Sequence, residues 1–600
     1  MSLRKITIGN AGGYWGDDPT ALRRQVEGGP LDYISMDFLA EITMSIMQKQ
    51  RSRDPESGYA KDFLPMIESV FKQIIEKQTT VITNAGGINP VGCAEAILAI
   101  GKKLGLSPKI AVVDGDDILA DIDKLESQGA KFTNMETGDD FASVKSSLLA
   151  ANTYFGATPV VAALEKNPNI VITGRVTDTG ITLASMIKSF GWALNDWDRL
   201  AAGIVAGHIL ECGSQSTGGN FTDWHKVSNF KNIGFPIVEM YEDGSFIVKK
   251  HPGTGGLVSV DTVREQLFYE MGDPKGYITP DVVADFSSIK LSQEGEDQVR
   301  VSGVKGFEPT PFYKVSMAYE DGFKCLGTIA ISGPNAREKA EAFSEIFWEK
   351  LGPEFKDTET EFFGWNACQR SLVGKSEANE IILRLGVRSQ NKEELRAFSK
   401  LVPSIILAGP PGVTVTGGAP KPAQIVSYWP ALINKEWLKP RVRILDDQGL
   451  GDPIGIQETP IGQFSGSESE AIVAEKASQT VDELFGKPQE GTPLEKIALA
   501  RSGDKGDTSN IGILARSQKA YEFLGEHLTP QVVKNLFQEL CFGKVTRYEL
   551  PNMLGYNFLL EESLGGGGTK TLRVDAQGKT FGQALLAQKM RIPDEILQEL

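Results

Sequence analysis

The sequence predicts an α/β protein built on a doubly wound, mostly parallel sheet. Five short apolar runs rich in β-branched residues, at 5–9, 31–35, 79–83, 109–113 and 169–173, are each followed by a polar loop. Uninterrupted apolar strands are typical of parallel sheets that helices cover on both faces. The helices expected after these strands lie near residues 19–27, 38–48, 92–103, 114–125 and 179–189. Right-handed crossovers would join these elements into one domain over residues 1–290.

The pattern changes at about residue 290. Residues 298–306, 312–322 and 323–333 read as neighbouring strands, and a helix at 336–350, a strand at 379–387 and a helix at 392–400 follow. This order predicts an α+β module over residues 291–445, packed on the first domain. Gly, Pro, Ser and Glu are abundant in residues 446–491, which we interpret as a linker that carries one helix at 468–484.

Residues 492–600 form the last predicted domain. Their elements follow the order strand, helix, helix, strand, strand, which predicts a small ferredoxin-like α+β domain. Within it, residues 500–512 (ARSGDKGDTSNIG) resemble a loop of exposed amides, although no Walker sequence is present. We therefore expect an anion-binding loop that includes Ser502, Asp504 and Lys505.

Charge and cysteine content limit the classes of function. The formal net charge of −16 argues against nucleic acid or an anionic membrane as a partner. The five cysteines are scattered without a CxxC pair, so neither a disulfide framework nor a zinc ribbon is expected. No apolar run approaches the ~20 residues that cross a bilayer, and no signal-peptide core follows the first residues. We expect a soluble cytoplasmic protein with a small-molecule substrate.

Polar and glycine residues follow every strand of the predicted parallel sheet. Open parallel sheets bind ligands at the carboxyl ends of their strands, where helix N-termini and backbone amides meet. The sequence NAGG follows two of the strands, and its glycines would let a ligand approach the main chain. Asn and Gly are also common turn residues, which is the structural alternative. The predicted substrate-binding residues of this edge are Asn10, Gly12, Gly13, Asn84, Gly86, Gly87, Asn89, Asp116 and Arg175.

Charged residues at this edge suggest acid–base chemistry. Arg175 could hold a carboxylate or phosphate through its planar guanidinium, or form an ion pair with Asp178. Crowding would raise the pKa of clustered carboxyls such as Asp37, Asp116 and Asp178, which suits proton transfer. Asp is equally common as a helix cap, so a structural role stays open for each.

A second candidate group lies at residues 207–225. His208 and Glu211 are three positions apart and would share a helix face with Cys212. They suit an acid–base pair better than a metal site, because HExxH and a second histidine in register are missing. We predict Asp37, Asp178, His208 and Glu211 as catalytic residues, with no metal and no required cofactor. The structural alternative is a polar helix end before a glycine turn.

A dinucleotide site is an alternative for the first two strands. The first loop spaces its glycines GxxGGxxG, which differs from GxGxxG, but Asp37 follows the second strand, where a ribose-binding acid is expected. An NAD(P)-dependent oxidoreductase therefore remains a hypothesis.

Several segments, in the same order along nearly the whole chain, resemble the acyclic terpene utilisation (AtuA-like) family. They are NAGGYWGDD, DYISMDFLAE, ITNAGGINP, VDGDD, VITGRVTDT, GHILECG, TGGNFTDW and ARSGDKGDTSNIG. The resemblance implies a large N-terminal domain followed by a small ferredoxin-like domain. It also implies a role in breaking down citronellol- and geraniol-type acids through branched CoA thioesters, and leaves the chemical step open.

We therefore expect a catabolic enzyme that acts on a branched-chain, terpenoid-type acyl-CoA or carboxylic acid, as a hydratase or lyase. CoA would enter as part of the substrate, and its phosphates would suit the C-terminal anion-binding loop. A homo-oligomer is expected. The third hypothesis is a non-catalytic binding or assembly subunit of a degradation complex.

Overall fold

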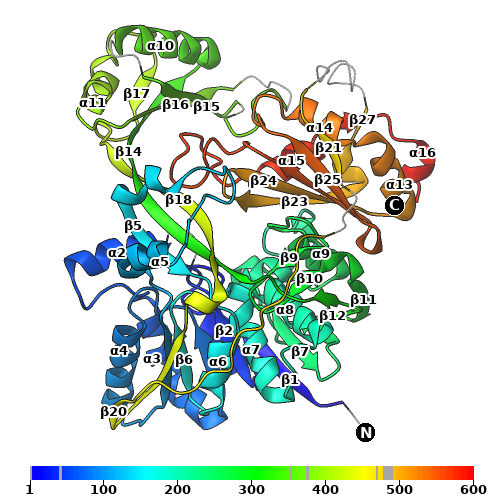
Figure 1. Ribbon diagram of the computed structural model, residues 1–600. Coiled ribbons are helices and arrows are strands. Elements are labelled where there is room, and N and C mark those ends of the chain that lie inside the picture. Colours follow the sequence, from blue (N-terminus) through cyan, green and yellow to red (C-terminus); the bar gives the residue numbers. More distant parts are fainter. Residues whose placement is uncertain are drawn as a thin grey trace. The chain divides into compact units, whose positions relative to one another are not determined.

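The computed structural model describes residues 3–39, 43–351, 355–365, 367–372, 378–467, 471–477 and 491–599 (Figure 1). The chain forms two compact units. Unit 1 comprises Met1–Ala318, Tyr428–Glu470 and Glu549–Met553, and unit 2 comprises Tyr319–Ser427, Ala471–Tyr548 and Leu554–Leu600. The bounds of these units differ from the domain boundaries expected near residues 290, 445 and 491. After Tyr428 the chain returns to the sheet of unit 1.

The predicted doubly wound sheet forms the centre of unit 1. Its five parallel strands run in the order β1, β2, β3, β6, β4, with bounds Lys5–Asn10, Tyr33–Met36, Thr80–Thr83, Ile170–Thr173 and Ile110–Asp114. Antiparallel strands extend the sheet on both sides and make it mixed. Beyond β1 lie β7 (Ile237–Tyr241), β8 (Phe246–Lys249), β12 (Gln298–Ser302) and β11 (Lys290–Gly295), and beyond β4 lie β19 (Arg441–Asp446) and β20 (Gly449–Leu450).

Helices cover both faces of this sheet, as the continuous apolar strands predict. Val81 and Ile82 are neighbours in β3, point to opposite faces and are both at most 1% exposed. Burying each such side chain stabilises the fold by about 1.5–3 kcal/mol. One face is covered by α1 (Ala21–Gly28), α3 (Phe63–Lys77) and α4 (Pro90–Lys103), and the other by α6 (Thr158–Leu164), α7 (Asp178–Phe190) and α8 (Trp197–Glu211).

Smaller elements complete unit 1. The helix expected at 38–48 is α2, which is described from Thr43 to Arg53, while residues 40–42 lie outside the described part. The remaining elements are α5 (Ile122–Ser127), α9 (Val260–Leu267), β5 (Leu148–Thr153) and a small sheet of β9 (Tyr277–Ile278), β10 (Val283–Asp285) and β13 (Lys305–Phe307).

Unit 2 contains an α+β layer in which helices cover one face of a sheet. The two strands expected between residues 312 and 333 are one strand, β14 (Phe312–Ser332). The strand continues through Gly322, which takes a φ of +78°, and residues 323–332 pair with β16 (Glu380–Ser389). Further elements are β15 (Asp357–Phe363), β17 (Val413–Val415), α10 (Ala336–Leu351), α11 (Leu395–Ser404) and the first part of β18 (Ala423–Asn434). Residues 312–318 of β14 and 428–434 of β18 belong to unit 1.

The ferredoxin-like part of unit 2 is a five-stranded sheet packed against helices. The strand order is β21, β25, β26, β24, β23. The bounds are β21 (Ile472–Ala474), β23 (Ala498–Lys505), β24 (Thr508–Ala515), α13 (Gln518–His527), α14 (Pro530–Leu536), β25 (Val545–Leu550), β26 (Gly555–Leu560) and α15 (Phe581–Leu586).

The helix expected at 468–484 is wrong at residues 472–474, because these residues form the short strand β21 and pair with β25. The other described residues of that stretch, 471 and 475–477, are not helical, and 468–470 and 478–484 lie outside the described part.

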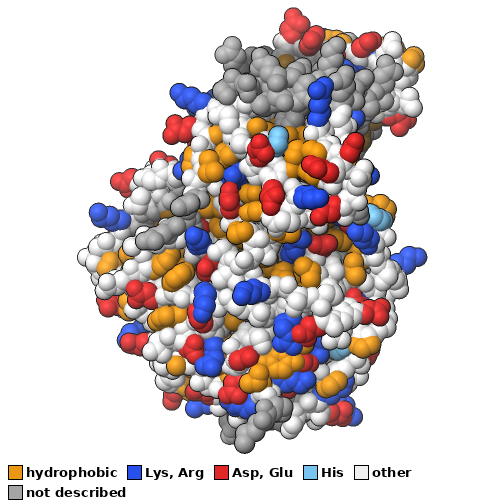
Figure 2. Space-filling view, turned by 90° about the vertical axis from the view of Figure 1, so that its right-hand side faces the viewer, with side chains coloured by type: hydrophobic (Ala, Val, Ile, Leu, Met, Phe, Trp, Pro, Cys, Tyr) orange, Lys and Arg blue, Asp and Glu red, His pale blue; other side chains and the backbone are white. Residues whose placement is uncertain are grey.

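The face drawn in Figure 2 carries charges of both signs. Lys and Arg side chains are interspersed with Asp and Glu there, and apolar areas lie between them. No helix in the described part of the chain combines the length and hydrophobicity that crossing a bilayer requires.

The NAGG loop after β3 generates a stability prediction. A Cβ at Gly86 would lie 2.6 Å from the Thr173 carbonyl oxygen and 2.8 Å from Pro90 Cα, which are backbone atoms that cannot rotate away. We expect Gly86→Ala to destabilise unit 1 by about 1–3 kcal/mol, measured as a lower Tm in thermal unfolding. Gly272→Ala is the control, because no atom lies within 4 Å of its Cβ position. Equal Tm values for the two variants would contradict the packing role.

Candidate functional site

The carboxyl ends of the five parallel strands share one edge of the sheet, as their parallel pairing requires. Asn10 ends β1, Asp37 follows β2, Asn84 follows β3, Asp114 ends β4 and Arg175 follows β6. Side chains that lie far apart in the sequence thus meet at one edge, which is the arrangement that places ligand sites in open α/β sheets.

Asn84 joins two of these loops. Its Nδ2 donates to Asp37 Oδ1 at 2.6 Å, and its Oδ1 accepts from the Phe38 amide at 2.7 Å. Asp37 Oδ1 also accepts from the Leu39 amide at 2.9 Å. Burial, and then the nearby Asp178, raise the pKa of Asp37 well above its usual value, although Arg175 and these hydrogen bonds oppose the shift. The buried position of Asp37 thus makes proton binding more favourable than at an exposed carboxyl.

Arg175 is the buried cation of the site. Its Nη1 donates to Asp178 Oδ1 and to the Leu39 carbonyl, both at 2.9 Å, and its guanidinium lies 4.1 Å from the centre of the Tyr154 ring. The residue is only 3% exposed, and its Nε has no hydrogen-bond partner among the described residues. The ion pair with Asp178, which was the structural alternative, is present, whereas substrate binding by Arg175 stays a prediction.

His208 and Glu211 form a buried pair at the end of α8. His208 Nδ1 lies 3.1 Å from Glu211 Oε1, and Nε2 lies 3.1 Å from the Gln266 carbonyl oxygen. Because a carbonyl can only accept, Nε2 carries a proton. Nδ1 therefore faces the Glu211 carboxyl at hydrogen-bond distance. Burial raises the pKa of Glu211 although His208 opposes the shift, and Asp178 and Glu270 raise it further.

The loop after β1 packs closely against the end of α8 because Gly13 has no side chain. A Cβ at Gly13 would lie 2.7 Å from the Cys212 carbonyl carbon and 2.9 Å from the Glu211 carbonyl oxygen. Only a glycine allows the loop to approach so closely. Electrostatic interactions link Asp37 and Arg175 to Asp178, and link Glu211 to His208 and Asp178. We call Asp37, Asp178, Glu211, His208 and Arg175 the carboxyl cluster, and the catalytic roles within it remain predictions.

Three residues of this region were missed by sequence reasoning. Tyr154 stacks on Arg175, Gln266 fixes His208, and the Tyr277 hydroxyl lies 3.5 Å from His208 Nδ1. Burial, and then Glu211 and Asp178, raise the pKa of Tyr277 well above its usual value. None follows a parallel strand directly, so no local pattern marks them.

Asp116 holds the backbone beneath Arg175. Its Oδ2 accepts from the Arg175 amide at 2.9 Å and from Asn152 Nδ2 at 3.0 Å, and the residue is 4% exposed. A Cβ at Gly174 would lie 2.0 Å from Asp116 Oδ1. Burial raises the pKa of Asp116 to about 6. Asp116 thus supports the position of Arg175, and contact with substrate stays a prediction.

Three glycine amides of the NAGG loops donate hydrogen bonds within the protein. The Gly12 amide donates to Asn10 Oδ1 and the Gly13 amide to Asp17 Oδ2, both at 2.9 Å. In the second loop, the Gly87 amide donates to the Asn84 carbonyl at 3.1 Å.

Packing accounts for the remaining residues of the second loop. Gly86 approaches β6, and a Cβ at Gly87 would meet Met47 and the Gly58 carbonyl. Asn89 Oδ1 accepts from the Gly92 amide and caps α4, while its Nδ2 donates to the Ser57 carbonyl at 3.1 Å.

The loop conformation expected at residues 500–512 is wrong. These residues form the hairpin of β23 and β24, in which Lys505 pairs with Thr508 across a tight turn. Ser502 Oγ donates to the Gly578 carbonyl at 2.6 Å and accepts from the Gly582 amide at 2.9 Å, and Asp504 lies 3.6 Å from Lys579. Substrate binding by Ser502, Asp504 and Lys505 stays a prediction.

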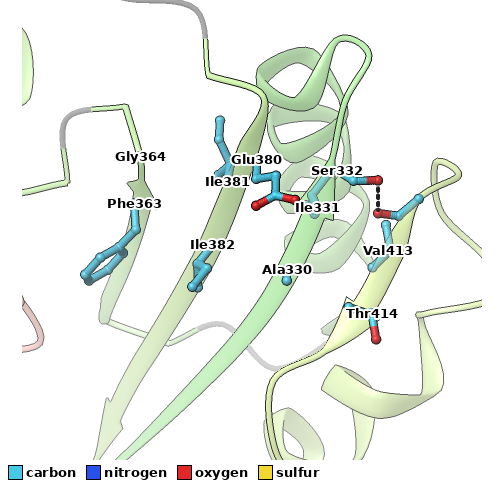
Figure 3. A pocket seen from close by; sticks show the side chains of 11 residues that line it. Ala330, Ile331, Ser332, Phe363, Gly364, Glu380, Ile381, Ile382, Val413 and Thr414 are labelled. Atoms are coloured by element: carbon cyan, nitrogen blue, oxygen red, sulfur yellow. Dashed lines mark hydrogen bonds between the residues drawn. The ribbon is translucent and has the colours of Figure 1, made fainter.

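One groove outside the carboxyl cluster is mainly apolar. A groove of about 590 Å³ in unit 2 lies between β14, β15, β16 and β17 (Figure 3). It is lined mainly by apolar side chains such as Ile382, and Glu380 is the one titratable residue in its lining. Its Ser332 hydroxyl donates to the Gly412 carbonyl at 3.1 Å. Within the described residues, no three His, Cys, Asp or Glu side chains are placed to hold a metal ion.

Two family models match the chain. The model described as acyclic terpene utilisation family protein AtuA matches residues 6–444, and the model described as AtuA ferredoxin-like domain matches residues 492–591. The second match covers the domain that the element order predicts at 492–600. No curated protein and no solved structure matches the chain.

Asp116 makes the stability of unit 1 depend on pH. Because its pKa is raised from its ordinary value near 4 to about 6, the folded state binds the proton more tightly than the unfolded state. Stability is therefore lost as the pH rises from about 4 to 6 and stays lower above. We expect Asp116→Asn to remove this loss. The free energy of unfolding of the variant minus that of the wild type should then be about 2–3 kcal/mol higher at pH 8 than at pH 4. Urea unfolding of both proteins at both pH values measures this difference.

Asp243→Asn is the matched control, because Asp243 is exposed and accepts only local hydrogen bonds from Ser245. An unchanged pH dependence in Asp116→Asn would show that Asp116 ionises without penalty in the fold.

Proposed function

The chain belongs to the acyclic terpene utilisation (AtuA) family, and we propose that it is a catabolic enzyme that performs acid–base chemistry on a branched-chain, terpenoid-type acyl group, as a hydratase or lyase. The observation that carries this proposal is the carboxyl cluster. Buried carboxyls whose pKa values are raised, beside a paired cation and a histidine, are typical of proton-transfer sites.

Two carboxyls of the cluster differ in their partners. Asp178 is ion-paired with Arg175, while Glu211 is buried beside His208 and its pKa is raised. Neighbouring carboxyls in such different surroundings are suited to act as base and acid. We assign Asp178 as the base that removes a proton next to the acyl carbonyl, and Glu211 as the acid that protonates the leaving hydroxyl.

This assignment balances the protons of a dehydration. The C–H bond of the substrate breaks and its proton goes to Asp178, the C–O bond breaks, and the hydroxyl leaves as water with the proton from Glu211. Hydration is the same step in reverse. His208 Nδ1 lies 3.1 Å from Glu211 Oε1 and the residue is 1% exposed, so it acts behind Glu211 as a positioning residue.

No specific observation favours the dinucleotide alternative. Asp37 is 6% exposed and its Oδ1 accepts from Asn84 and Leu39, so it is not presented to a ribose. The helix after the first glycine loop begins only at Ala21, and no helix N-terminus follows Gly13 directly. A pyrophosphate site of the dinucleotide type needs both features.

Isotope exchange tests the proposed chemistry. The purified protein is incubated in deuterated water with branched-chain acyl-CoA thioesters, and deuterium uptake and water addition are followed by mass spectrometry. We expect Asp178→Asn and Glu211→Gln each to lower the rate by about 10²–10⁴-fold, the usual contribution of a positioned acid or base. Asp243→Asn and Glu294→Gln are matched controls that remove exposed carboxyls of unit 1 and should leave the rate unchanged.

His208→Gln should lower the rate less and shift the pH profile, because Glu211 remains but loses its proton partner. Rates in Asp178→Asn and Glu211→Gln that equal those of the controls would overturn the assignment. Absence of exchange and turnover in the wild-type protein, together with co-purification at fixed stoichiometry with a second protein, would support the non-catalytic subunit instead.

A further inference from the structure

We infer that unit 2 pairs with a second copy of this chain, and that Leu407 of each copy enters the apolar groove of the other. This contact goes beyond the proposed function, because it involves no residue of the carboxyl cluster. Three features of unit 2 carry it: a sheet face that is only partly covered, a leucine presented to solvent near the groove in the chain, and opposite charges on the two surfaces.

The groove is one end of the sheet face that lies opposite the helices of unit 2. Ile331 and Ile381 belong to the core that α10 and α11 share with the sheet. Their neighbours along each strand therefore point to the other face. Ile382, which is 42% exposed, lies within the row of such neighbours. The row crosses the strands in register and consists of Phe363, Ile382, Ala330 and Thr414 (Figure 3).

The next part of the same face is covered by another segment of the chain. Arg384 and Gly386 follow Ile382 on this face of β16. Arg384 Nη1 donates to the Leu572 carbonyl at 2.6 Å, and a Cβ at Gly386 would lie 3.5 Å from Leu572 Cβ. Polypeptide is thus what covers this face, and within the described residues the end at Ile382 stays open as the groove.

Leu407 is an apolar residue that the fold holds in solvent, with 98% of it exposed. In its turn, the Ala408 amide donates to the carbonyl of Ile405, which is buried in the core. A Cβ at Gly409 would lie 2.6 Å from the Phe343 ring, so the turn also packs against α10. The turn is therefore anchored on both sides of Leu407, and burial of this side chain in a partner would add hydrophobic stabilisation.

The positions of Leu407 and the groove favour a second copy as the partner. Gly412 and Val413, in the segment that follows Leu407, line the groove. Since Leu407 is almost fully exposed, it does not occupy the groove of its own chain. A two-fold axis between two copies would bring each leucine to the other groove, so that one surface makes the same contact twice.

Charge complementarity supports the same partner. Residues 395–412, which comprise α11 and the turn, contain no acidic residue. Of their two cations, Arg396 is paired with Glu393 at 2.7 Å, and Lys400 is exposed. Glu380 is the titratable residue in the lining of the groove. Opposite charges on the two surfaces favour their encounter and fix the register in which they meet.

Sedimentation velocity of the full chain at about 1–100 µM tests the pairing. We expect the wild type to form a dimer that dissociates on dilution, and Leu407→Asp to weaken it at least about tenfold, because the introduced charge would lose its hydration in an apolar contact. Leu104→Asp is the matched control, since Leu104 is an exposed leucine of unit 1 and should keep the wild-type dissociation constant. A monomeric wild type, or a dissociation constant in Leu407→Asp equal to that of the wild type, would overturn the pairing.

A mixture of two variants tests whether Leu407 meets the groove. Ile382→Asp places a charge in the groove and should weaken the dimer as Leu407→Asp does. In a mixed dimer of these two variants, one intact leucine still faces one intact groove. We expect the mixed dimer to bind at least about fivefold more tightly than either variant with itself. Equal affinities in the mixture and in the single variants would overturn this contact, and circular dichroism checks that both variants fold.

A small apolar ligand is the competing occupant of the groove. The dye ANS, which fluoresces on exposed apolar surface, is the probe for it. Dye binding to a monomeric wild type that is lost in Ile382→Asp and kept in Leu407→Asp would assign the groove to a ligand and overturn the pairing. Dye binding that decreases as the wild type dimerises would support the pairing, because the second copy then covers the groove.

Discussion

The buried guanidinium of Arg175 is the charge on which the arrangement of the site depends. A buried cation is stable only when it is paired and hydrogen-bonded, and here each partner comes from a different part of unit 1. Asp178 begins α7, Leu39 follows β2 and Tyr154 follows β5, while Asp116 after β4 fixes the Arg175 amide. Satisfying this one cation therefore fixes several loops at the sheet edge, including the loop that carries Asp37.

The two NAGG sequences show how identical letters take different roles in different surroundings. Asn10 closes its own loop by accepting from Gly12, whereas Asn84 reaches across to Asp37 and to the Phe38 amide. The glycines of both loops allow close approach to other parts of the chain, to the end of α8 in the first and to β6 in the second. Sequence reasoning assigned them to a ligand because a missing Cβ makes room equally for a ligand or for neighbouring backbone.

The parallel strands and their shared edge could be predicted because both follow from local pattern: apolar runs set the strands, and parallel pairing brings their ends together. Asp37, Asp178 and Arg175 were placed at that edge for this reason, and the His208–Glu211 pair follows from helical spacing. Tyr277 and Gln266 could not be predicted, because they reach His208 only through the packing of distant segments. The hairpin at residues 500–512 was misread because glycine, serine and aspartate favour loops locally, while pairing of β23 with β24 overrides that preference.

His208 and Gln266 are joined by two reciprocal contacts. The imidazole Nε2 meets the Gln266 carbonyl at 3.1 Å, and the Gln266 side-chain amide donates to the His208 carbonyl at 3.0 Å. The orientation of the ring is thus tied to the spacing between α8 and α9. A substitution in the interface of these two helices could change their separation without replacing His208 or Glu211. It would then alter the contact between the two side chains and how readily Glu211 gives up a proton.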